Sequence, residues 1–217
     1  MTKGTVHMAV YDTLADWEVG HAIAHLRNGA AHRESGGFDV VTVGLTRDPV
    51  ETMGGVRVMP DITLGDLHPT DSRMLILAGA ASWDAEPALL APFARMARAF
   101  LAAEVPVAAI CGATAGLARE GLLDDCVHTS AADGYLAATG YAGAEHYRDA
   151  DAVTDGNLIT AGPTAPVAFA REIFGKLDTY EPRVLDAWYR LFATGDPSAF
   201  AVLAAAGHSA QDGDRAH

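Results

Sequence analysis

The residue whose setting points most clearly to chemistry is Cys111. It follows Val105–Ile110, a short apolar run that is typical of a buried parallel strand, and it precedes a predicted helix over Ala113–Leu123. A strand that turns at once into a helix needs small residues two positions either side of the bend. Ala109 and Ala113 meet that need, with Gly112 next to the apex. The pattern predicts a nucleophile elbow with sulfur in place of a serine hydroxyl.

The predicted position of Cys111 favours a reactive thiol. Open α/β sheets bind ligands at the carboxyl ends of their strands, where this cysteine would lie. It would also lie at a helix N-terminus, where unpaired N–H groups and the helix dipole favour thiolate over thiol. The alternative is that Cys111 is a small buried hydrophobe, as most free cysteines are.

A cysteine nucleophile needs a proton carrier within reach, and the residue directly after Cys111 is glycine, not histidine. Glu18 is the first candidate, because it lies early in the helix predicted over Leu14–Asn28, at the carboxyl edge of the first strand. A carboxyl packed beside a sulfur anion could stay protonated and donate a hydrogen bond to the sulfur. The alternative is a solvated first-turn glutamate that interacts with the helix dipole.

His128 is the second candidate for a proton carrier. It lies in a short strand predicted over Val127–Thr129 and could turn toward the same edge of the sheet. The alternative is a histidine held by hydrogen bonds at a strand end. The segment Ala78–Gly79–Ala80 ends the neighbouring strand, so the backbone N–H groups of Ala80 and Gly112 could converge on an oxyanion. Without that role, the segment is a simple turn.

The sequence contains little that predicts a metal or an organic cofactor. Glu18, His21 and His25 share one face of a helix, but the glutamate of a zinc-protease helix is missing and no second ligand cluster is evident. Partly exposed helix histidines are the favoured interpretation. No Walker loop, no G-x-G-x-x-G after a strand and no G-x-S-x-G occurs. We therefore expect no metal site and no cofactor.

The composition excludes several classes of partner. The chain has 217 residues, half of them apolar, and a formal net charge of −13, which argues against nucleic acid and anionic membranes. No apolar stretch reaches the roughly 18–20 residues that span a bilayer. The N-terminus does not resemble a signal peptide, and Cys111 and Cys126 form no disulfide framework. We expect a reduced, cytoplasmic protein.

Strands and helices alternate along the chain, which predicts an α/β fold with one doubly wound, mostly parallel sheet sandwiched by helices. The other elements are expected as strands at Thr5–Tyr11, Phe38–Leu45 and Arg73–Leu77, hairpins at Thr52–Pro60 and Ala152–Ala161, and helices at Leu64–Pro69, Pro87–Ala102, Asp133–Thr139 and Pro163–Leu177. We predict one domain over residues 1–206, with its core over 5–177 and a C-terminal helical extension over 183–206. Residues 207–217 are expected to form a flexible tail.

The chain resembles the ThiJ/PfpI superfamily over about Thr5–Leu177. The matching pieces are the first strand with its Glu18 helix, the Met53-Gly54-Gly55 hairpin, Leu75-Ile76-Leu77-Ala78-Gly79-Ala80, Ala108-Ala109-Ile110-Cys111-Gly112 and Leu158-Ile159-Thr160-Ala161-Gly162-Pro163. The resemblance implies a flavodoxin-like, class I glutamine amidotransferase-like fold and a homodimer. It also implies Cys111 as the nucleophile, Glu18 as its carboxyl partner, and Ala80 and Gly112 as sources of oxyanion N–H groups.

The chain also departs from that superfamily. Ala78 and Ala80 replace a proline and a glycine of the usual oxyanion loop. Gly112 stands where protease-like members carry a histidine, and Ser130 stands where deglycase-like members carry one. His128, two residues before Ser130, could substitute. No C-terminal His-x-Glu pair is present, so we expect no true glutamine amidotransferase.

The sequence therefore predicts a cysteine-dependent enzyme. By the resemblance, the Cys111 thiolate would attack an electrophilic carbon of a small-molecule substrate such as a glyoxal, with glyoxalase-, deglycase- or hydrolase-like chemistry. Glu18 would hold and relay the proton, and His128 could assist. The alternative is a non-enzymatic redox-sensing or stress-response protein in which Cys111 is oxidised to a sulfinate.

Overall fold

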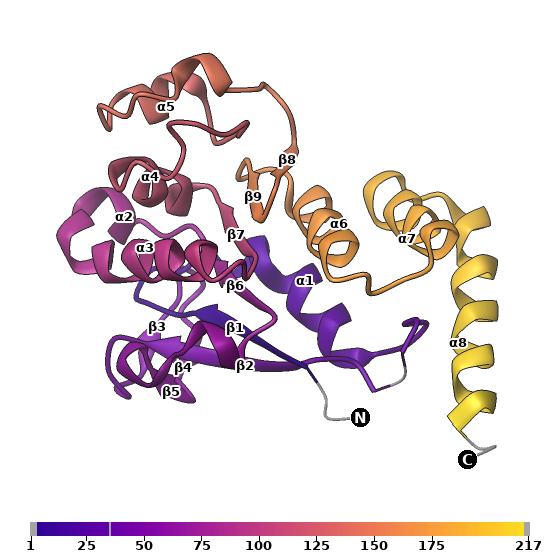
Figure 1. Ribbon diagram of the computed structural model, residues 1–217. Helices are drawn as coiled ribbons and strands as arrows, with labels where there is room; N and C mark the ends of the chain where they lie inside the picture. The colour runs from indigo at the N-terminus through magenta and orange to yellow at the C-terminus, as the bar shows by residue number, and fades with distance from the viewer. Residues whose placement is uncertain (1–3, 35, 215–217) are drawn as a thin grey trace.

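The computed structural model describes residues 4–34 and 36–214 and contains a seven-stranded sheet in the order β5-β2-β1-β6-β7-β9-β8 (Figure 1). Its strands are β1 (Thr5–Ala9), β2 (Asp39–Gly44), β5 (Ile62–Thr63), β6 (Met74–Leu77), β7 (Val107–Ile110), β8 (Ala152–Asp155) and β9 (Leu158–Ala161). All neighbouring pairs are parallel except β8 with β9 at one edge. A separate antiparallel hairpin joins β3 (Val50–Glu51) to β4 (Arg57–Val58).

Helices cover both faces of the sheet, which confirms the predicted fold class (Figure 1). The α-helices are α1 (Asp16–Asn28), α2 (Ser82–Ala85), α3 (Pro87–Ala102), α4 (Gly112–Arg119), α5 (Asp133–Ala137), α6 (Pro166–Lys176), α7 (Pro182–Thr194) and α8 (Phe200–Asp214). The 3₁₀ turns are η1 (Leu64–Asp66), η2 (Pro69–Asp71), η3 (Ala144–His146) and η4 (Pro197–Ala199). Helices α1 and α6 pack together on one face, and α2, α3 and α4 pack together on the other. No helix in the described ranges is long and apolar enough to cross a membrane.

The central strands are apolar at every position except Thr160, because both of their faces are covered. Strands β6, β7 and β9 read MLIL, VAAI and LITA, and every one of these residues is buried. Such continuous apolar runs are typical of parallel strands between two helical layers. The sequence pattern alone is therefore enough to place the strand before Cys111 in the middle of the sheet.

The order of the strands creates a switch point beside β1. After β1 the chain builds β2 and β5 on one side, and it then returns to build β6, β7 and β9 on the other. In open α/β sheets the crevice at such a switch point, at the carboxyl ends of the strands, is where ligands bind. The segments that leave β1, β6 and β7 carry Glu18, Gly79 and Cys111, respectively.

Two predicted elements differ from the observed ones near the site. Val127–Thr129 forms no strand, and His128 makes only an isolated bridge with Tyr147. The helix predicted over Ala113–Leu123 ends at Arg119, since Gly121 adopts a left-handed conformation with φ of 68° that stops it.

The C-terminal extension is more helical than predicted and packs on the same chain. Helix α8 continues to Asp214, so it includes most of the segment that was predicted as a tail from residue 207. Helix α7 packs on α6 and buries Trp188, whose ring meets Phe174 edge to face at 4.8 Å between centroids. His21 and His25 of α1 contact the same aromatic cluster through edge-to-face contacts with Trp188.

The start of α4 is fitted closely against Trp83, which is completely buried. The Trp83 indole N–H lies 3.1 Å from the Tyr11 hydroxyl and 3.0 Å from the carbonyl oxygen of Ala78, so the ring is fixed at the end of β6. A Cβ added at Gly116 would lie 2.2 Å from a carbon of this ring. Glycine at 116 is therefore what allows α4 to approach Trp83.

We predict that Gly116→Ala lowers the free energy of unfolding by about 1–3 kcal/mol, because overpacking forces Trp83 or α4 to move. Gly20→Ala is the matched control: it lies within α1 and an added Cβ would meet nothing within 4 Å. Relief of the backbone entropy cost should make that variant more stable by about 0.5–1 kcal/mol. Urea unfolding followed by tryptophan fluorescence measures both, and equal stabilities of the two variants would contradict the packing account.

Candidate active site

Cys111 lies at a strained turn between β7 and α4, as predicted for a nucleophile elbow. Its φ of 56° and ψ of −125° are unusual for a residue with a side chain. Its N–H donates to the carbonyl oxygen of Ala161 at 3.0 Å. Its carbonyl oxygen accepts from the Thr114 N–H at 3.0 Å and from the Thr114 hydroxyl at 2.6 Å. These bonds hold the turn while the side chain stays half-buried.

Glu18 projects from the first turn of α1 into the protein and is fully buried, with no exposed surface. Its Oε2 accepts a hydrogen bond from the Gly79 N–H at 2.6 Å. Its Oε1 is buried without a hydrogen-bond partner of ordinary geometry within the described chain. The alternative of a solvated surface glutamate is therefore incorrect.

Gly79 is the point at which Glu18 and Cys111 meet. A Cβ at this position would lie 2.7 Å from Glu18 Oε2 and 2.8 Å from the Cys111 Cβ, closer than real Cβ atoms come to other atoms. The absence of a side chain therefore allows the carboxyl and the thiol to approach each other. Sequence reasoning assigned Gly79 only to a strand end; the available signal was a glycine at the end of the strand next to the elbow strand.

Burial and mutual repulsion set the titration of this pair. Burial raises the pKa of Glu18 from 4.5 to about 7, and hydrogen bonding from the Gly79 N–H and the Cys111 thiol only partly opposes that rise. Burial, and then the negative charge of Glu18, raise the pKa of the Cys111 thiol to about 12, against a lowering by the Gly112 N–H. The lowering of the Cys111 pKa that was predicted from the helix N-terminus is therefore outweighed. The extent of burial, which is the largest cause of the rise, was not evident from the sequence pattern.

Because Glu18 has a pKa of about 7 and Cys111 a pKa of about 12, the two groups hold one proton between them over a wide pH range. Once the first proton has left, the single negative charge that remains disfavours loss of the second. The remaining proton can sit on the thiol or on the carboxyl. A carboxylate beside a thiol can therefore act as a base for it without full, prior formation of a thiolate.

Gly112 and Ala80, whose backbone N–H groups are expected to receive an oxyanion, lie close together at the elbow. The Gly112 N–H interacts with the Cys111 sulfur, and a Cβ on Gly112 would lie 3.2 Å from the carbonyl oxygen of Ala80. The Ala80 N–H has no acceptor within the part of the chain that the structure describes. The Ala80 N–H thus lacks a partner that would compete with an oxyanion, whereas the Gly112 N–H already interacts with the sulfur, and the role of both amides stays a prediction.

Both ring nitrogens of His128 have partners other than the thiol. The ring is buried, with Nδ1 2.8 Å from the carbonyl oxygen of Cys126 and Nε2 3.0 Å from the hydroxyl of Tyr141. A carbonyl only accepts, so Nδ1 carries the hydrogen and Nε2 accepts from the tyrosine. Burial lowers the pKa of His128, which fits this neutral form. The expectation that His128 assists Cys111 is not supported, since both nitrogens already have partners.

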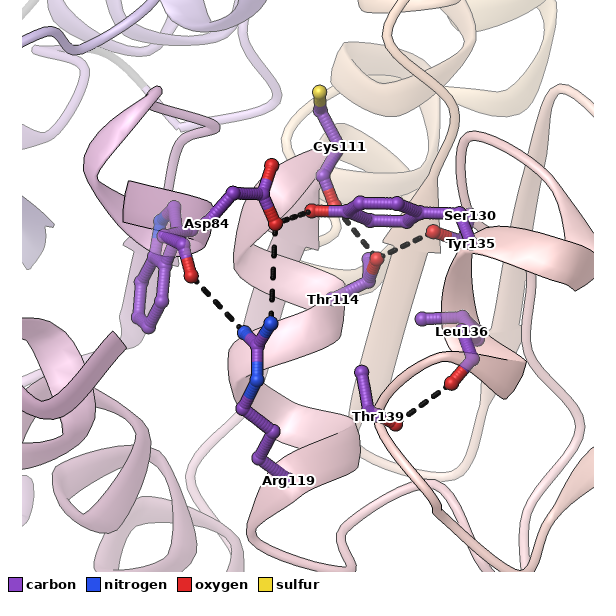
Figure 2. A network of polar contacts seen from close by, with 9 residues as sticks. Asp84, Cys111, Thr114, Arg119, Ser130, Tyr135, Leu136 and Thr139 are labelled. Atoms are coloured by element: carbon purple, nitrogen blue, oxygen red, sulfur yellow. Dashed lines mark hydrogen bonds and ion pairs between the residues drawn. The ribbon is translucent and has the colours of Figure 1, made fainter. Parts of the chain in front are cut away.

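Ser130, two residues later, belongs to the scaffold of the elbow. Its Oγ lies 2.6 Å from the Thr114 Oγ1, which in turn donates to the Cys111 carbonyl oxygen (Figure 2). This chain of hydroxyls braces the backbone of Cys111 and leads away from its sulfur. Ser130 thus supports the elbow through its backbone and offers no proton to the thiol.

A second polar group beside the elbow was missed by sequence reasoning. The Tyr135 hydroxyl donates to Asp84 Oδ1 at 2.9 Å, and Arg119 Nη2 lies 3.8 Å from the same oxygen (Figure 2). These residues come from α5, α2 and α4, three elements with no local pattern that links them. In the described ranges, no group of three His, Cys, Asp or Glu side chains could hold a metal ion.

Comparisons with known proteins agree with this architecture. The sequence profile of the DJ-1/PfpI family matches residues 4–176. A Bacillus subtilis (strain 168) protein named "Uncharacterized protease YoaZ" is 36% identical over 206 residues, which cover 94% of this chain and 97% of that protein. The likeness thus extends over nearly the whole of both proteins.

Two solved structures have the same fold. The thiJ/pfpI family protein from Bacillus anthracis is 36% identical with a TM-score of 0.89, over 95% of this chain and 98% of that one. The DJ-1 superfamily protein Atu0886 from Agrobacterium tumefaciens is 32% identical with a TM-score of 0.78, over 88% and 98% of the two chains. Coverage of 95% carries the likeness past residue 176 into the C-terminal helices.

We predict that Glu18→Gln changes the dependence of stability on pH. In the folded protein the carboxyl keeps its proton up to pH about 7, whereas its ordinary pKa is 4.5, so the folded state binds more protons between these values. Wild-type stability should therefore fall, relative to the variant, as pH rises from 4.5 to 7. At about 1.4 kcal/mol per pH unit, the change is about 3 kcal/mol.

Chemical unfolding at pH values from 4.5 to 8 tests this expectation. Glu145→Gln is the control, since the Glu145 side chain is 83% exposed and its substitution should leave the two stability curves parallel. A Glu18→Gln curve that also runs parallel to the wild-type curve would show that Glu18 is ionised in the folded protein at low pH.

Proposed function

This chain belongs to the DJ-1/PfpI family, and from that premise we propose that it is a cysteine-dependent enzyme that acts on a small electrophilic substrate. The observation that carries the proposal is the meeting of the Glu18 carboxyl and the Cys111 side chain across Gly79, at a strained elbow. A buried carboxyl with a raised pKa beside a half-buried thiol is an arrangement that general acid–base and nucleophilic catalysis use.

In the proposed reaction, Glu18 receives the thiol proton as the Cys111 sulfur attacks a carbonyl carbon. The C–S bond forms while the carbonyl electron pair moves to oxygen, and the N–H groups of Gly112 and Ala80 stabilise that oxygen. The Glu18 carboxylic acid then returns the proton to it. The raised pKa suits both roles, because the carboxyl exchanges a proton readily near neutral pH.

By analogy with the family, a 1,2-dicarbonyl compound such as a glyoxal is the substrate class that we propose. After the sulfur has added to the aldehyde carbon, a proton moves from that carbon to the neighbouring carbonyl carbon through an enediol, which leaves a thioester on Cys111. Water then cleaves the C–S bond, so that a 2-hydroxy acid leaves and the thiol is restored. One carbonyl carbon is oxidised and its neighbour is reduced, so no external oxidant is needed. A peptidase, as in the name of the Bacillus subtilis relative, is a weaker proposal here. Gly112 follows the cysteine, and both ring nitrogens of His128 are engaged.

We predict that the rate of Cys111 alkylation, measured in a Cys126→Ser background, rises through pH about 7. That is where the pair loses its first proton, well below the ordinary thiol value of about 8.5. In Glu18→Gln the thiol must lose its own proton without a base, so the midpoint should move to higher pH. The rate at pH 7 should then fall by roughly 100-fold, the lower end of the range for loss of a proton carrier.

His128→Gln is the matched control and should keep the wild-type midpoint, because His128 contacts Cys126 and Tyr141. A wild-type midpoint at 8.5 or above would remove the chemical basis of the proposal. Turnover of glyoxals that is lost in Cys111→Ser supports the enzyme. Peroxide-dependent mass gain at Cys111 without turnover would favour the alternative, a redox-sensing protein.

A further inference from the structure

The polar group formed by Asp84, Tyr135 and Arg119 lies beside the elbow and has no role in the reaction described above. Tyr135 donates its hydroxyl hydrogen to Asp84, and Arg119 pairs with the same carboxylate. The other terminal nitrogen of Arg119 donates to the Trp83 carbonyl oxygen at 3.0 Å. Helices α2, α4 and α5 are thus tied together around one carboxylate, whose position is fixed by two partners (Figure 2).

This carboxylate lies on the same side of the fold as the reactive sulfur. Trp83, which precedes Asp84, packs against Gly112, with its Cβ and a ring carbon 3.2 Å from an added glycine Cβ. Figure 2 shows the Asp84 carboxyl group between Arg119 and the Cys111 side chain in this view. The Asp84 side chain is 57% exposed, so a molecule that approaches from solvent can meet its charge.

The charged side chains that shift the pKa of the Cys111 thiol are both acidic. Glu18 and Asp84 both raise the pKa of the thiol through their negative charge, after the larger effect of burial. The guanidinium of Arg119 is engaged by Asp84 and by the Trp83 carbonyl, so its donors face those groups. The chain as a whole carries a formal charge of −13. An anion that approaches the sulfur therefore meets repulsion from fixed carboxylates.

We propose that Asp84, held by Tyr135 and Arg119, is a specificity-determining residue that makes the Cys111 site prefer uncharged or cationic electrophiles over anionic ones. The inference rests on the proposed function, in which Cys111 is the reacting group. It narrows the substrate class: an uncharged dicarbonyl should react in preference to a 2-oxo acid of similar size. Tyr135 is a positioning residue, because it acts through Asp84, and Arg119 offsets part of the Asp84 charge.

Two thiol reagents that differ in charge test the proposal. Iodoacetamide is neutral and iodoacetate is an anion; each forms a C–S bond and expels iodide. The ratio of their rates at one pH cancels the fraction of thiolate and isolates the effect of reagent charge. We measure the rate with iodoacetamide divided by the rate with iodoacetate in the Cys126→Ser protein at low salt. Dividing this value by the same quotient for N-acetylcysteine gives the normalised ratio.

We expect the normalised ratio to favour iodoacetamide, and Asp84→Asn to reduce that preference by roughly three- to fivefold. This is the size expected for removal of one charge several ångströms away in a partly solvated site. The asparagine oxygen can still accept from Tyr135, so the local hydrogen bond is kept. Asp133→Asn, which removes the same charge from the first turn of α5, should leave the ratio unchanged.

Two further measurements keep the proposal falsifiable if Asp84→Asn fails to fold. Arg119→Gln removes the cation that offsets Asp84, so the preference for iodoacetamide should increase. In the Cys126→Ser protein, high salt should weaken the preference, because exposed charges are screened. A normalised ratio near one, or one that Asp84→Asn and salt leave unchanged, overturns the proposal.

The outcomes also separate this proposal from the proposed function. If both reagents react slowly at neutral pH but Asp84→Asn still changes their ratio, charge selection stands and thiol activation fails. If both reagents react rapidly and Asp84→Asn leaves the normalised ratio unchanged, the activated thiol stands and the charge selection is refuted.

Discussion

The site depends on one steric constraint, which is that no side chain fits between Glu18 and Cys111. Gly79 fills that position, and its N–H holds the carboxyl while its missing Cβ lets the thiol approach. The carboxyl comes from the helix after β1, the glycine from the end of β6 and the thiol from the end of β7. Only a sheet in which these strands are neighbours in parallel register brings the three together.

The fold tolerates several unfavourable local features at this point. A buried carboxyl oxygen lacks an ordinary partner, and a cysteine adopts a left-handed backbone conformation. Each such feature costs free energy, and each persists because surrounding bonds and packing leave no alternative. Hydrogen bonds to Ala161 and Thr114 fix the elbow, and Trp83 fills the space beneath it. Hydrogen bonds and close packing therefore hold the backbone at the point where Glu18 and Cys111 are in unfavourable states.

Local patterns in the sequence were enough to predict much of the fold. The bounds of α3, Pro87–Ala102, were predicted correctly from its proline start and its apolar spacing, and the elbow followed from small residues around Cys111. The position of Glu18 was predicted because the first turn of a helix that follows a parallel strand lies at the carboxyl edge of the sheet. These features depend on residues that are close together in the chain, so a single sequence is enough to predict them.

The features that were not predictable depend on contacts between distant segments. His128 was expected near the thiol, but Tyr141 and Cys126 take its nitrogens, and no spacing rule indicates that. The burial that governs the titration of Cys111 and Glu18 is a property of the assembled layers. The pairing of Asp84 with Tyr135 joins residues 51 positions apart.

The backbone of Cys111 has an implication for how this protein could change under selection. Glycine adopts positive φ without the steric cost that a side chain meets, so Cys111 occupies a position that glycine would fill more comfortably. Selection for thermal stability alone would therefore drive this position away from cysteine. A lineage that retains the thiol at such a bend accepts a less stable protein in exchange for its chemistry. Residue 111 thus offers a sensitive marker of whether a descendant sequence keeps the nucleophile of the proposed reaction.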